Sequence, residues 1–70
     1  MDKEELKKLE AYLRQTLGSP TLTVRARPRK TDSAEVMVGD EFIGLIFRDD
    51  EDADDLSYNF QMAILAGDLD

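Results

Sequence analysis

The stretch RDDEDADD, residues 48–55, contains six carboxylates, which could hold a hard cation or only shape a turn. Calcium loops of the EF-hand type place oxygen ligands at positions one, three and five, a glycine at six and a bidentate glutamate at twelve. Asp50, Asp52 and Asp54 meet the first three requirements, but position six is an aspartate and position twelve a glutamine. These three aspartates are a candidate site for weak calcium or magnesium binding. The competing interpretation is a solvated turn whose acids oppose strand pairing.

The remaining side chains do not point to catalysis. The chain has no cysteine and no histidine, which excludes thiol and imidazole chemistry and the usual ligands of zinc, haem and iron–sulfur clusters. The sequence has no glycine-rich phosphate loop and no nucleophile elbow. Six of the sixteen carboxylates fall in one loop, which would not hold them to the precision that acid–base chemistry requires. We therefore expect a protein that is not an enzyme and that uses no cofactor.

The charge distribution indicates which partners are plausible. The net charge of −7 disfavours nucleic acids and anionic membranes, because both bind proteins mainly through Lys and Arg. Residues 1–30 carry eight of the nine Lys and Arg against four acids, whereas residues 31–70 carry one base against twelve acids. The acidic half makes a basic protein a candidate partner. No apolar run reaches the roughly 20 residues that cross a bilayer, and the first residues lack the apolar segment of a secretory signal, so we expect a cytoplasmic protein.

A helix is predicted over residues 3–17, because leucines recur there at spacings of three and four. Asp2 can cap the first turn, Gly18 can end the helix in the left-handed conformation, and Pro20 prevents its continuation. The apolar stripe consists of Leu6, Leu9, Leu13 and Leu17.

From Thr21 the apolar period changes to two, which predicts strands. Gly39 and Asp40 suit a two-residue hairpin. The last segment also fits a helix, although a strand is favoured. The predicted strands cover about residues 21–27, 33–38, 41–48 and 56–65. Residues 1–70 are therefore expected to form one α+β domain, with the N-terminal amphipathic helix packed on an antiparallel meander of three to four strands.

The third predicted strand is apolar on both faces, and one helix can cover only one of them. Phe42 and Ile46 are expected to share a face, with Ile43, Leu45 and Phe47 on the other. Monomers of this size rarely leave such a patch exposed unless it serves association. We therefore expect a homodimer, formed through the uncovered face or by edge pairing. The residues assigned to this interface are Phe42, Ile46, Met37, Arg25 and Arg27, the two arginines being placed to meet a partner's acidic loop.

Four segments resemble a family of short, uncharacterised bacterial proteins classed as a domain of unknown function. They are Asp32–Val36, Phe42–Gly44, Phe47–Asp52 and Leu56–Leu65, and the most distinctive part is Ser57–Leu65. The resemblance implies a small bacterial cytoplasmic protein and brings no activity or site residues with it.

Overall fold

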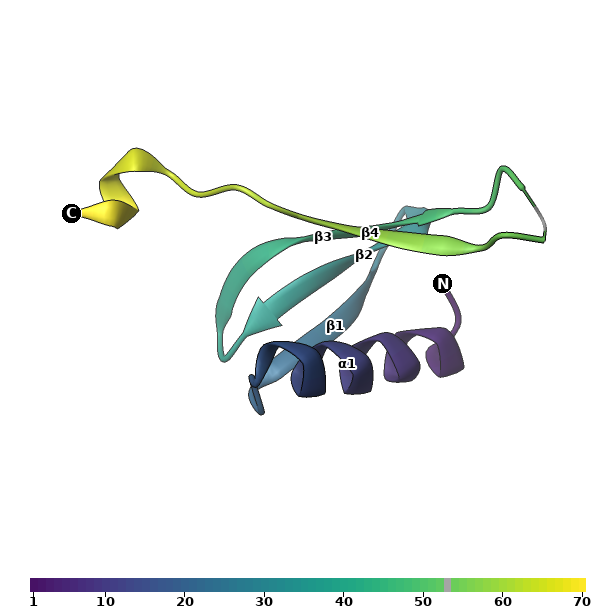
Figure 1. The fold of residues 1–70 in the computed structure, drawn as a ribbon, viewed down its shortest axis with the longest axis horizontal. Coiled ribbons are helices and arrows are strands. Elements are labelled where there is room, and N and C mark those ends of the chain that lie inside the picture. The colour runs from purple at the N-terminus through teal and green to yellow at the C-terminus, as the bar shows by residue number, and fades with distance from the viewer. Residues whose placement is uncertain (53) are drawn as a thin grey trace.

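The computed structural model describes residues 1–52 and 54–70, and it shows one helix followed by four strands (Figure 1). The elements are α1 (Lys3–Leu17), β1 (Leu22–Arg27), β2 (Lys30–Val38), β3 (Glu41–Asp49), β4 (Ser57–Met62) and a short 3₁₀ turn, η1 (Ala66–Leu69). The strands form one antiparallel sheet in the order β1-β2-β3-β4. The predicted α+β meander is confirmed, and the ambiguous last segment is a strand. None of the described helices is long and apolar enough to cross a membrane.

The helix begins and ends at the predicted capping residues. The Asp2 side chain accepts a hydrogen bond from the Glu5 backbone N–H at 2.8 Å. At the other end Gly18 adopts a φ of 62°, and its N–H donates to the Arg14 carbonyl. The left-handed backbone conformation costs glycine little, because glycine has no Cβ. These two local signals, Asp2 and Gly18, therefore fix the helix length.

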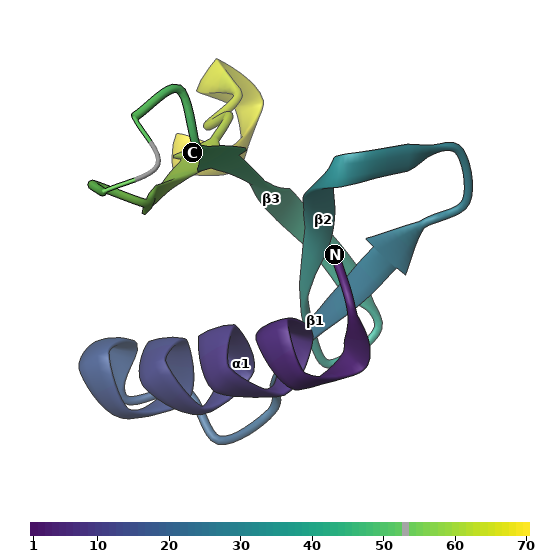
Figure 2. The ribbon, with the colours of Figure 1, turned by 90° about the vertical axis from the view of Figure 1, so that its right-hand side faces the viewer.

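The core lies between the helix and the sheet, on the β1 side. Its buried apolar residues are Leu22, Val24, Ala34, Val36 and Ile46. Three helix leucines, Leu6, Leu9 and Leu13, are half-buried against this cluster, and no helix residue is fully buried. The helix contacts the sheet mainly through β1, and Figure 2 shows it diverging from β3 and β4. The sheet is therefore only partly covered.

A β-bulge in β3 decides which apolar residues enter the core. Val36 pairs with Gly44 and Met37 with Phe42, so Ile43 is an extra residue that reverses the alternation. As a result Ile46 faces the helix at 1% exposure, while Phe42 faces the opposite side at 52%. The expectation that these two residues share a face is wrong, and Ile46 is a core residue rather than an interface residue.

The first hairpin turn lies earlier than the sequence predicts. Its two turn residues are Pro28 and Arg29, and β2 begins at Lys30 instead of near residue 33. A second bulge, between Ala26 and Arg27, accommodates the change of register. The Gly39–Asp40 hairpin forms as predicted, with Gly39 at a φ of 60°.

Candidate functional site

An apolar groove opens between α1 and β4, where the helix diverges from the sheet. Its volume is about 280 Å³, and it is lined by Leu9, Tyr12, Leu13, Ile46, Tyr58 and Phe60. The helix residues are neighbours because they are spaced by three and four, and Tyr58 and Phe60 share a face because strand side chains alternate. In β4 these aromatic residues lie beside Arg48 and Ile46 of β3. The groove therefore continues the core toward solvent.

Tyr58, which lines this groove, also belongs to a cluster of three polar side chains from three elements. The Tyr58 hydroxyl donates to Glu5 Oε2 at 2.5 Å, and the Arg48 guanidinium lies 3.1 and 3.2 Å from the two Glu5 oxygens. Glu5 belongs to α1, Arg48 to β3 and Tyr58 to β4. The Glu5–Arg48–Tyr58 cluster thus links the first turn of α1 to strands β3 and β4.

The cluster stabilises a charged carboxylate beside a neutral phenol. The hydrogen bond from Tyr58 lowers the pKa of Glu5, and Arg48 lowers it further, while partial burial opposes both. The same hydrogen bond, with burial, raises the pKa of Tyr58, because ionisation would place two anions together. The pKa of Arg48 is raised by its hydrogen bond to Glu5. At neutral pH the arrangement is an ion pair between Glu5 and Arg48, with Tyr58 as a second donor to the carboxylate.

Sequence reasoning missed this cluster. It placed Glu5 within the predicted helix, residues 3–17, and gave no role to Arg48 or Tyr58. One signal was present, since Arg48 is the only base among residues 31–70. A single cation among so many acids, on a strand, suggests a specific partner.

The two edges of the sheet differ sharply. Helix side chains occupy backbone groups of β1: the Val24 N–H donates to Glu10 Oε1 at 3.0 Å, and Arg14 Nε donates to the Leu22 carbonyl at 2.6 Å. Strand β4 is the other edge, and residues 57–67 contain no charged side chain. Charged residues and proline are common protections of exposed edges. The β4 edge has neither, so it remains open to pairing.

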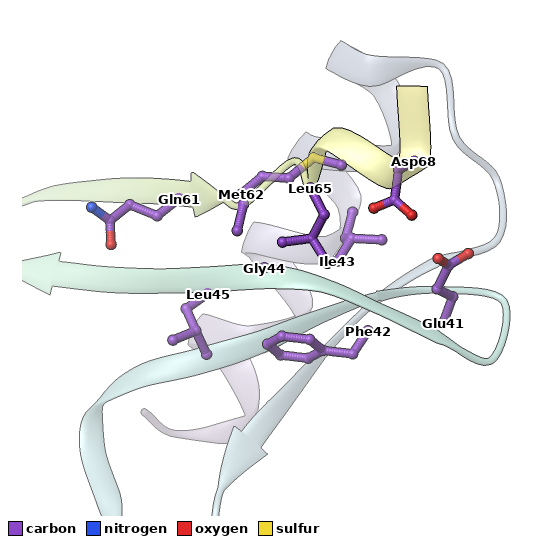
Figure 3. Close-up of a pocket in the computed structure, with 10 residues that line it drawn as sticks. Glu41, Phe42, Ile43, Gly44, Leu45, Gln61, Met62, Leu65 and Asp68 are labelled. Atoms are coloured by element: carbon purple, nitrogen blue, oxygen red, sulfur yellow. The ribbon is translucent and has the colours of Figure 1, made fainter. Parts of the chain in front are cut away.

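The segment after β4 projects beyond the body of the protein (Figure 1) and leaves apolar side chains exposed. Met62, the last residue of β4, is 53% exposed, and Ile64, in the projecting segment, is 64% exposed. Figure 3 shows Met62 and Leu65 close to Ile43. Together these three side chains help to line a second, shallow hollow of about 560 Å³, whose lining includes the acids Glu41 and Asp68.

The predicted interface residues lie in different environments. Met37 and Phe42 pair across β2 and β3 on the face away from the helix, and Arg25 pairs with Glu35 on that same face. Arg27 donates to the buried Ser33 hydroxyl at 3.0 Å. The structure therefore groups Met37, Phe42 and Arg25 on one sheet face and gives Arg27 a partner within the chain.

The acids of the loop between β3 and β4 make local bonds. The Asp54 N–H donates to Asp52 Oδ1 at 3.1 Å, and Asp50 lies 3.5 Å from Arg48 Nε. Within residues 1–52 and 54–70, no group of three or more carboxylates is arranged to hold a metal ion. This geometry gives no support to the metal site predicted at Asp50, Asp52 and Asp54, and fits a turn.

The fold and its open surfaces define a class: a small α+β protein with one helix on a four-stranded antiparallel meander, an apolar groove and a free strand edge. A family model described as protein of unknown function (DUF3126) matches residues 5–68, and the chain belongs to this family. This confirms the resemblance to a domain of unknown function. No curated protein matches the chain, and no solved structure does.

Proposed function

We propose that this protein is a small non-enzymatic interaction module that assembles with copies of itself. The observation that carries the proposal is the incomplete cover of the sheet: α1 packs along β1 and leaves the apolar groove beside β4 open. A small domain gains little from its own core, and association is one of the few ways to add buried apolar area without disulfides or metals.

The exposed apolar side chains support the same proposal. Phe42, Leu56, Met62, Ile64 and Leu65 are all more than half exposed. Scattered apolar residues are ordinary on a protein surface, but Met62 and Ile64 lie on the continuation of the groove-lining strand. A second molecule that covered them would extend the core of the first.

Charge limits where such contacts can form. Each copy carries a net charge of −7, so two copies repel unless they meet through an uncharged surface. Residues 57–67 supply one. We also propose that the module acts in a bacterial cytoplasm, as the family resemblance implies.

Sedimentation velocity at protein concentrations from about 1 to 100 µM tests the proposal. This range spans the dissociation constant of a dimer with micromolar affinity. We expect the sedimentation coefficient to rise with concentration toward that of a dimer. Because salt screens the repulsion between the acidic copies, association should strengthen as salt is added. Binding of a basic protein partner would instead weaken as salt is added, because salt screens attraction between opposite charges. A single monomeric species throughout, at low and high salt, would overturn the proposal.

A further inference from the structure

We infer that two copies pair through their β4 strands, antiparallel and with Gln61 opposite the partner's Gln61, so that each copy fills the groove of the other. The inference rests on the proposed self-association and specifies its surface and register. The pairing would join two four-stranded sheets into one, with both helices on the same face.

The choice of edge follows from what already occupies the other one. At β1, Glu10 and Arg14 of the helix hold the Val24 N–H and the Leu22 carbonyl, so a second strand would have to displace both side chains. The chain of β1 also carries Arg25 and continues directly into Pro28, features that oppose edge pairing. At β4 no charge and no proline stand in the way.

The register follows from which residues are already covered. The even-numbered residues Tyr58, Phe60 and Met62 share the helix-facing side of β4, paired with residues 48, 46 and 44 of β3. If the strand continues past Met62, Ile64 lies on the same side. The backbone of Leu65 is extended, with a φ of −82° and a ψ of 143°. The first two of these side chains line the groove, whereas Met62 and Ile64 are exposed.

Pairing about Gln61 places the groove-lining residues of each copy opposite the exposed apolar residues of the other. It places Phe60 opposite the partner's Met62, and Tyr58 opposite the partner's Ile64. Directly opposed side chains in an antiparallel pair have Cβ atoms about 4.5–5.5 Å apart, close enough to pack. A shift of one residue would turn one strand's apolar side chains to the wrong face. A shift of two would place Phe60 or Met62 opposite its own copy and lose this match.

The absence of cysteine makes the register directly measurable. In the inferred pair the two copies of residue 61 lie opposite each other, with Cα atoms about 4.5–5.5 Å apart, within the range that a disulfide spans. Gln61→Cys should therefore give a covalent dimer on mild oxidation. Ser57→Cys is the matched control: it is exposed on the same strand and points to the same face, but its two copies would be about 27 Å apart at about 3.4 Å per residue.

A charge substitution gives a second readout that does not depend on disulfide geometry. Gln61→Lys would place two ammonium groups directly opposite each other, which opposes pairing. We expect it to weaken dimerisation at least about tenfold in sedimentation. Gln15→Lys, on the exposed helix, adds the same charge away from β4 and should not weaken the dimer. Both changes reduce the net negative charge, so general repulsion cannot explain a loss seen only at position 61.

The outcomes separate this inference from the proposed function. Efficient cross-linking at position 61 but not 57, together with a weakened Gln61→Lys dimer, would support the register. If the wild-type protein dimerises, but Gln61→Cys cross-links no better than Ser57→Cys and Gln61→Lys does not weaken the dimer, the β4 pairing is overturned and self-association stands. A monomeric wild-type protein would overturn both.

Discussion

Replacing Gly44 with alanine should destabilise the protein because the added methyl group has no room. Gly44 is buried in β3 opposite Met62 of β4. A Cβ at this position would overlap the backbone oxygen of Gln61 and would lie 2.8 Å from Cε1 of the Phe60 ring. The ring can rotate away, but the backbone oxygen can move only if β4 shifts relative to β3. The requirement for glycine is therefore steric and comes from the neighbouring strand.

The size of the effect can be worked from these contacts. Inserting a methyl group into a packed interior costs about 1–3 kcal/mol. Because the obstructing atom belongs to the backbone, we expect about 2–3 kcal/mol here. For a domain of this size, each kcal/mol lowers the Tm by about 4–8 °C. Gly44→Ala should therefore lower the Tm by at least about 8 °C.

Urea unfolding and thermal melts followed by circular dichroism measure this loss. Gly67→Ala is the matched control, because no atom of residues 1–52 and 54–70 lies within 4 Å of the Cβ that it would add. That variant should unfold within about 0.5 kcal/mol of wild type, as surface substitutions usually do. If Gly44→Ala were as stable as Gly67→Ala, the close approach of β4 to Gly44 would be refuted, and with it the placement of Phe60 beside the groove.

Three further predictions concern the ion-pair cluster, the core and the acidic loop. Tyr58→Phe should cost about 1 kcal/mol at neutral pH, because the phenol donates to a partly exposed carboxylate. The pKa of Glu5 is lowered in the folded state, so its contribution to the free energy of unfolding is present above the unfolded pKa of about 4.3 and is lost as pH falls through the folded pKa. In urea melts at about pH 3, the difference in free energy of unfolding between wild type and Tyr58→Phe should therefore be smaller than at neutral pH. Ile46→Ala should cost about 2–5 kcal/mol and Phe42→Ala under about 1 kcal/mol in the monomer, and equal losses would contradict the bulge at Ile43. Calcium titration followed by amide NMR shifts should give no saturable change in residues 49–55 below about 1 mM, and saturation there would revive the metal hypothesis.

Much of the fold could be predicted from local signals. Asp2 and Gly18 fix the ends of the helix through bonds within a few residues, and the change from a period near four to a period of two separates helix from strands. The Gly39–Asp40 turn sets the β2–β3 hairpin in the same way. Each of these features depends on neighbours in sequence, which is why the chain itself displays them.

What could not be predicted depends on residues far apart in the chain. The bulge at Ile43 has no distinctive sequence signal, yet it moves Ile46 into the core and Phe42 out of it. The attachment of Glu5 to Arg48 and Tyr58 spans most of the chain and needs the finished sheet to exist. The open groove likewise follows from where the helix comes to rest, which depends on side-chain bonds from Glu10 and Arg14 to β1.

The Glu5–Tyr58 hydrogen bond joins residues 53 positions apart, so α1 cannot complete its contacts until β4 is present. During synthesis at about 5–20 residues per second, α1 emerges seconds before β4 does. Until then Glu5 can contact Arg48 of β3 but not Tyr58, and the helix can pack on β1, β2 and β3 but not on β4. Docking of β4 is therefore expected late in folding, and mutations at Tyr58 should mainly speed unfolding rather than slow folding.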